Sequence, residues 1–136
     1  MKKSSRVTLM EAIISLFIFL TILAFAAPAI VQGISRHNLN SAALKAAGDM
    51  WDTKFLAMQE GTIFRIDFAS GSYQVVRVSD NSVLKVGDLA NYGVAITDGS
   101  ITFDSRGFSS SGAIVLSNGV GVKTIRINNL GKVKIS

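Results

Sequence analysis

The stretch VTLMEAIISLFIFLTILAFAAPAIV, residues 7–31, decides where this protein lies and how it can assemble. Residues 12–31 hold no charged residue, and Ser15 and Thr21 are the only side chains among them that can form hydrogen bonds. A helix of about twenty apolar residues, at about 1.5 Å per residue, spans the hydrocarbon core of a bilayer. The stretch therefore predicts a transmembrane helix.

Two residues in this stretch are unusual for a simple anchor. Glu11 stands at the start of the apolar run, where an ionised carboxylate is costly unless a partner neutralises it, so it is a candidate functional residue. Pro28 removes a backbone hydrogen bond to the carbonyl of Ala24, so we expect the helix to bend or open locally there. The plain alternative is that Glu11 reaches the lipid headgroups and that Pro28 is tolerated.

The spacing of these residues resembles the N-terminus of type IV pilin-like proteins, which include the pseudopilins of type II secretion. Residues 7–11, VTLME, match the start of the family pattern, and Pro28 stands seventeen residues after Glu11. The resemblance implies that a prepilin peptidase cuts before Val7 and methylates the new amine. It also implies that Glu11 neutralises the N-terminal amine of a neighbouring subunit while the apolar helices pack into a filament core.

Arg6 departs from this pattern, because the family has glycine directly before the cleavage point. A small residue lets the backbone lie close in the peptidase site, whereas an arginine side chain should clash. Three outcomes stay open: an uncleaved anchor, a permissive peptidase, or an altered leader.

Positive charge is concentrated before the apolar run. The chain has a net charge of +5, and Lys2, Lys3 and Arg6 supply three of its 14 basic side chains. Basic residues that flank a first membrane segment hold that end in the cytoplasm. We therefore expect a basic leader over residues 1–6 and a single pass through the bacterial inner membrane. The C-terminal domain would lie in the periplasm or in an extracellular filament.

A cleavable secretory signal peptide is the competing interpretation, since Ala24-Phe25-Ala26 before Ala27 is a fair cleavage site. Glu11 interrupts the start of the apolar region, and this region is longer than such peptides usually have. Both features favour the membrane anchor. A secreted enzyme released after Ala26 would need an activity that no residue suggests.

Residues 35–60, which follow the membrane and filament-core segment 7–34, predict an amphipathic helical stem. Apolar side chains recur in the stem at steps of three or four, so we expect their face to pack on the following domain. They are Leu44, Ala47, Trp51, Phe55 and Met58. The charged residues lie mostly off this face and are expected in solvent: Lys45, Asp49, Asp52 and Lys54.

From residue 61 to the C-terminus the period of the apolar pattern changes to two, which predicts a β-rich globular domain. Seven or eight strands are expected between turns such as Asp98-Gly99 and Asn118-Gly119. The expected strands are 62–68, 73–78, 83–86, 92–96, 100–103, 113–117, 121–127 and 132–135. The predicted fold class is α+β, with one long N-terminal helix packed on a C-terminal antiparallel β-sheet domain.

Three segments of this domain carry a second resemblance: ITFDSRGF at 101–108, AIVL at 113–116 and IRINNLGKVK at 125–134. Together they resemble the C-terminal domain of GspH/FimT-type minor pseudopilins. The resemblance implies a minor pilin or pseudopilin that assembles into, or primes, a type IV pilus or a type II secretion pseudopilus. Other pilin or pseudopilin subunits, prepilin peptidase and membrane lipid would be its partners.

Five basic residues follow Asp104 with no acidic residue among them: Arg106, Lys123, Arg126, Lys132 and Lys134. Lys132 and Lys134 are two apart, so on a strand both point to one face, beside a strand that carries Lys123 and Arg126. Some FimT-like proteins bind DNA through a glycine followed by alternating arginines, and Gly131–Lys134 matches that stretch with lysines, which lack bidentate geometry. DNA capture is therefore the alternative function. Edge-strand lysines that keep the protein soluble are the plain explanation.

Composition argues against an enzyme, a metal site or a cofactor. The chain has no cysteine, and its one histidine, His37, lies in the predicted stem, far in sequence from the acids and serines of the sheet domain. Gly119-Val120-Gly121 is followed by neither a helix nor the Lys-Ser/Thr of a phosphate loop, so we expect no nucleotide site.

Overall fold

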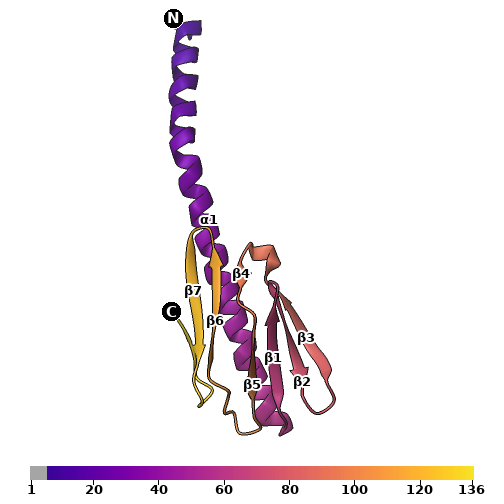
Figure 1. Ribbon diagram of the computed structural model, residues 1–136. Coiled ribbons are helices and arrows are strands. Elements are labelled where there is room, and N and C mark those ends of the chain that lie inside the picture. Colours follow the sequence, from indigo (N-terminus) through magenta and orange to yellow (C-terminus); the bar gives the residue numbers. More distant parts are fainter. Residues whose placement is uncertain (1–5) are drawn as a thin grey trace, which may run out of the picture. The chain divides into compact units, whose positions relative to one another are not determined.

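The computed structural model describes residues 6–136 (Figure 1). The chain divides into a first unit that ends at Ile34 and a second unit, Ser35–Ser136. One helix, α1 (Leu9–Glu60), begins in the first unit and ends in the second, and within the described residues eight strands follow it. The predicted α+β class, a long N-terminal helix followed by antiparallel sheet, is confirmed.

The C-terminal end of α1 lies where the sequence predicts it. Gly61 adopts the left-handed conformation, with φ of +64°, and the N–H of Thr62 donates to the carbonyl of Ala57 at 3.2 Å. This is the Schellman arrangement, which satisfies helix carbonyls that have no partner further along the chain. At Pro28 α1 continues without a break, and the expected bend or local opening there stays a prediction.

The strands form two four-stranded sheets in which every neighbouring pair is antiparallel. The first sheet has the order β3-β2-β1-β5, with β1 (Phe64–Ala69), β2 (Ser72–Arg77), β3 (Ser82–Asp88) and β5 (Gly99–Phe103). The second has the order β4-β6-β7-β8, with β4 (Ala95–Ile96), β6 (Gly112–Asn118), β7 (Gly121–Ile127) and β8 (Val133–Ile135).

The strand expected at 92–96 is mostly absent. A short 3-10 helix, η1 (Ala90–Tyr92), precedes Gly93, whose φ of +62° turns the chain out of the extended conformation. Only Ala95–Ile96 then pairs with β6. The expected strand at 132–135 also begins one residue later, at Val133.

The predicted buried face of the stem is wrong. Of the five apolar residues expected there only Ala47 is buried, whereas Leu44 is 65% exposed and Phe55 is 58% exposed. Trp51 stacks on Phe55, with ring centroids 6.1 Å apart, on the outer side of the helix. The buried residues of α1 are Leu39, Ala42, Ala43, Ala46, Ala47, Asp49, Met50, Thr53 and Ala57. Alanines let the backbone of α1 approach the strands closely, so the large side chains are left outside.

The core joins this small-residue face of α1 to one face of each sheet. Buried residues alternate with less buried ones along β1, where Phe64, Ile66 and Phe68 point inward. Ile125 and Ile127 do the same on β7. Such alternation is the pattern of a sheet that packs on a core with one face only. The other face of each sheet is therefore open to solvent or to partners.

Candidate functional sites

The apolar part of α1 is the first candidate site. Over residues 9–34 every side chain except Ala26 is exposed, including Leu9 at 80% and Phe25 at 78%. The helix is long and apolar enough here to cross a membrane, by its length and composition. An apolar surface of this size is unfavourable in water, so this segment is a candidate for burial in lipid or against other apolar helices.

Glu11 lies in the first turn of α1, three residues after the residue that caps the helix. The N–H of Glu11 donates to Oγ1 of Thr8 at 3.3 Å, which makes Thr8 the N-cap residue and places Glu11 at the N3 position. Within residues 6–136 the Glu11 carboxylate forms no ion pair. The cap therefore orders the start of the helix and leaves the carboxylate free for a cation from elsewhere.

The expected cleavage point lies just before this cap. Arg6 and Val7 are exposed and precede the first helical residue, so the bond between them is accessible. Cleavage and methylation stay predictions. The rest of the basic leader, residues 1–5, lies outside the described residues.

The second candidate site is a groove on the face of the second sheet that carries Arg126 and Lys134. The strand register places Arg126 opposite Ala113 of β6 and opposite Lys134 of β8, so these three side chains form one row across the sheet. Lys132 lies at the next row, where its carbonyl accepts the N–H of Asn128 at 3.2 Å. The groove holds about 470 Å³ and is lined by Ser111, Gly112, Ala113, Arg126, Ile127, Asn128, Lys132 and Lys134.

The groove brings together three of the four predicted DNA-binding residues. Lys123 is not among them. Along β7 it stands two residues before the buried Ile125, so its side chain points to the same face as Ile125 and away from Arg126. Within residues 6–136 the three groove cations, Arg126, Lys132 and Lys134, form no ion pair, and the groove is lined by no carboxylate. The arrangement is a basic groove, also lined by the small residues Ser111, Gly112 and Ala113, which can accept an extended anion.

The turn before Lys132 has a specific geometry that requires glycine. The side chain of Asn128 accepts the N–H groups of Leu130 at 3.1 Å and of Lys132 at 2.9 Å. Gly131 has φ of +71°, and a Cβ on it would lie 2.3 Å from the carbonyl oxygen of Gly107. Any larger residue would therefore be strained and would push the turn away from the 104–108 loop. This gives a physical reason for the glycine that precedes the two lysines.

Sequence patterns missed a buried polar network on the stem. Asp49, expected in solvent, is 7% exposed, and its carboxylate accepts hydrogen bonds from the Tyr73 hydroxyl and the Lys85 ammonium. Burial, together with the hydrogen bond and the negative charge of Asp49, raises the pKa of Tyr73 far above its ordinary value. The signal in the sequence was the spacing of Asp49 from Ala46 and Thr53, which are small residues on the buried face.

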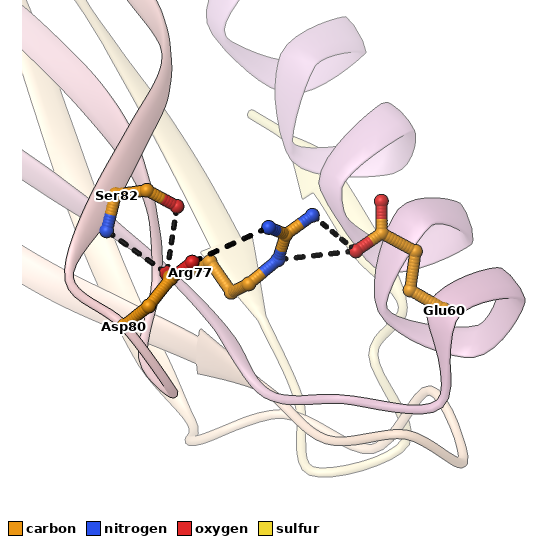
Figure 2. A network of polar contacts seen from close by, with 4 residues as sticks. All are labelled: Glu60, Arg77, Asp80 and Ser82. Atoms are coloured by element: carbon orange, nitrogen blue, oxygen red, sulfur yellow. Dashed lines mark hydrogen bonds and ion pairs between the residues drawn. The ribbon is translucent and has the colours of Figure 1, made fainter.

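A second network ties the end of α1 to the β2–β3 hairpin (Figure 2). Nη2 and Nε of Arg77 lie 2.5 and 3.1 Å from Oε2 of Glu60, and Nη1 lies 3.5 Å from Oδ2 of Asp80. The Glu60 carboxylate raises the pKa of Arg77, whereas the Ser82 hydroxyl and N–H lower the pKa of Asp80. These residues fix the hairpin.

In residues 6–136 no group of three or more His, Cys, Asp or Glu side chains could hold a metal ion.

Comparisons with known proteins found a protein family and solved structures that are similar to this chain. The family model of the type II transport protein GspH matches residues 53–131, more than half of the chain. The crystal structure of the type IV minor pilin FimU of Pseudomonas aeruginosa has a TM-score of 0.62 at 12% identity, covering 74% of this chain and 90% of the FimU chain in that structure. A second crystal form of FimU has a TM-score of 0.59 at 13% identity, covering 72% and 92%. At such identities the likeness concerns the fold alone. No match was found among the curated proteins.

Proposed function

The chain belongs to the GspH family of type II transport proteins, and we propose that it is a minor pilin-like subunit that assembles into, or primes, a type II secretion pseudopilus or a type IV pilus. The observation that supports this most is the exposed apolar segment over residues 9–34, followed by a unit that has its own core. Such a segment can lie in lipid before assembly and against other apolar helices afterwards.

The same segment sets the proposed location. Residues 9–34 anchor the chain in the inner membrane, and the basic leader, with Lys2, Lys3 and Arg6, stays in the cytoplasm. The sheet domain then lies on the far side of the membrane, where it can meet other subunits. The exposed face of the stem, with Leu44, Trp51 and Phe55, gives those subunits a further apolar surface.

Glu11 is the proposed assembly residue. Processing before Val7 would create a new amine, and Glu11 of one subunit would pair with this amine on its neighbour. In an apolar filament core an unpaired carboxylate costs several kcal/mol, so the pair would favour one register of packing.

The test compares Glu11→Gln with Asp52→Asn, a matched loss of one negative charge at an exposed position on the stem. Both variants are expressed in the native host, and subunits are cross-linked in the intact membrane. We expect Glu11→Gln to insert normally and to lose its cross-links to other pilin-like subunits, while Asp52→Asn keeps them. Equal cross-linking by the two variants would remove Glu11 from assembly.

DNA binding is a second candidate function, and the groove is the observation that favours it. Arg126, Lys132 and Lys134 lie together without carboxylates, and the resemblance to FimT-like proteins implies DNA contacts in the stretch Gly131–Lys134. These cations would displace the counterions condensed on the DNA phosphates, so the affinity would fall steeply with salt.

The test uses the full chain in non-ionic detergent with a short labelled DNA duplex. We expect Lys132→Ala with Lys134→Ala to reduce the slope of log K against log salt by roughly 1.8, since each phosphate contact contributes about 0.9. The control is Lys45→Ala with Lys123→Ala, which removes the same charge outside the groove and should leave the slope nearly unchanged. Absence of binding by the wild-type chain at low salt would eliminate this function.

A further inference from the structure

Lys54 of α1 makes contacts that its position on the stem does not suggest. Its ammonium lies 3.3 Å from the carbonyl oxygen of Gly131 and 3.5 Å from that of Leu130, and it lies 5.1 Å from the ring centroid of Trp51. The side chain is half-buried rather than in solvent. A cation that bonds two carbonyls of one turn fixes that turn to the helix.

Two glycines make room for this side chain. A Cβ on Gly107 or on Gly131 would each lie 3.1 Å from Cε of Lys54, so the lysine passes over both residues. On the sheet side, the Ser109 hydroxyl donates to the carbonyl of Asn128 at 2.7 Å. The β7–β8 turn is thus held by α1 from one direction and by the 104–110 loop from another.

The same turn carries one wall of the basic groove. Asn128 and Lys132 line the groove, whereas Lys54 does not. Three neighbouring cations repel one another, and a loose turn would let Lys132 move away from Arg126 and Lys134. We infer that Lys54 is a positioning residue for the groove, which fixes the β7–β8 turn so that Lys132 stands beside Arg126 and Lys134 without itself touching the bound anion. The bound anion in this inference is the DNA of the proposed function, whereas the contacts by which Lys54 fixes the turn do not depend on DNA.

The test compares Lys54→Met with Lys45→Met in the full chain in non-ionic detergent. Both variants lose one positive charge from α1, and Lys45 is exposed. We expect Lys54→Met to bind a short DNA duplex about tenfold more weakly, because it loses hydrogen bonds that involve a charged group. Lys45→Met should change binding less than about twofold. The slope of log K against log salt should stay at the wild-type value, because Lys54 contacts no phosphate. Lys54→Arg keeps the donors and should restore affinity.

A second readout does not depend on DNA. The N–H groups of Leu130 and Lys132 bond to Asn128, and their hydrogen exchange should accelerate in Lys54→Met but not in Lys45→Met or Lys54→Arg. If the wild-type chain binds no DNA, the DNA proposal fails and this exchange still decides the role of Lys54. Unchanged exchange in Lys54→Met would overturn the inference, as would a salt slope reduced by about 0.9, which would make Lys54 a direct phosphate contact.

Discussion

Removal of a single hydroxyl should show how strongly the stem is fixed to the first sheet. Tyr73 of β2 is buried with its ring over Gly87 of β3, and its hydroxyl donates to the carboxylate of Asp49 on α1. Tyr73→Phe keeps the ring and leaves Asp49 with Lys85 as its remaining side-chain partner. A hydrogen bond to a buried charged group contributes roughly 1.5–3 kcal/mol. We therefore expect the variant to lose about 2 kcal/mol and about 10 °C in Tm at pH 7.

The loss should depend on pH in a defined direction. Burial and the Asp49 carboxylate raise the pKa of Tyr73 above its ordinary value of 10.0. Above pH 10 the unfolded chain releases this proton while the folded chain retains it, so stability falls by about 1.4 kcal/mol per pH unit through this group. Phenylalanine has no such proton. The gap between wild type and Tyr73→Phe should therefore narrow from pH 10 to 11.5.

The assay is urea unfolding of the full chain in non-ionic detergent, followed by the fluorescence of Trp51, the single tryptophan. At pH 7 Tyr92→Phe is the matched control, because Tyr92 is half-buried and its hydroxyl has no hydrogen bond within residues 6–136. A Tyr73→Phe variant within about 0.5 kcal/mol of wild type, below the usual effect of a buried hydrogen bond, would refute the reasoning. So would a gap that stays constant above pH 10.

Two further predictions concern stability. Gly87→Ala places a Cβ 2.0 Å from the ring of Tyr73 and should destabilise the fold by about 2 kcal/mol or more. Gly48→Ala lies at a helical position with open space around it and should stabilise the fold by roughly 0.5–1 kcal/mol. Thermal melts of both variants measure these changes. Asp104 is partly desolvated, yet backbone N–H groups of its own loop at 2.9 Å keep its pKa below 3.8. Its contribution is present above about pH 4 and is lost as pH falls through the lowered pKa, so Asp104→Asn should flatten the acid side of the pH–stability curve.

Local patterns in the sequence carry much of this fold. The apolar run after Glu11, the alternation in the strands and Gly61 at the helix end each act within a few residues, so they can be recognised without tertiary information. The buried face of the stem could not be recognised in the same way. Alanine is common on both faces of helices, and the large side chains of Trp51 and Phe55 stay exposed although they are the most apolar.

The groove could be predicted only in part. The two-residue spacing of Lys132 and Lys134 predicts a shared face, but their meeting with Arg126 depends on the register that the Asn128–Gly131 turn imposes. Lys123 and Arg126 are three residues apart, which on a strand means opposite faces, so this separation was readable from the sequence. The contact of Lys54 with the β7–β8 turn joins residues 76 and 77 positions apart and has no local signal.

The central claim, a pilin-like subunit that assembles through its apolar helix and Glu11, predicts a defined N-terminus. The most direct measurement is the intact mass and N-terminal sequence of the chain extracted from its native membrane. The account predicts a chain that begins at a methylated Val7, which would mean that the peptidase tolerates Arg6 and that the amine for Glu11 of a neighbour exists. A chain that begins at Met1 would contradict assembly through this amine, and a soluble chain that begins at Ala27 would contradict the membrane anchor itself.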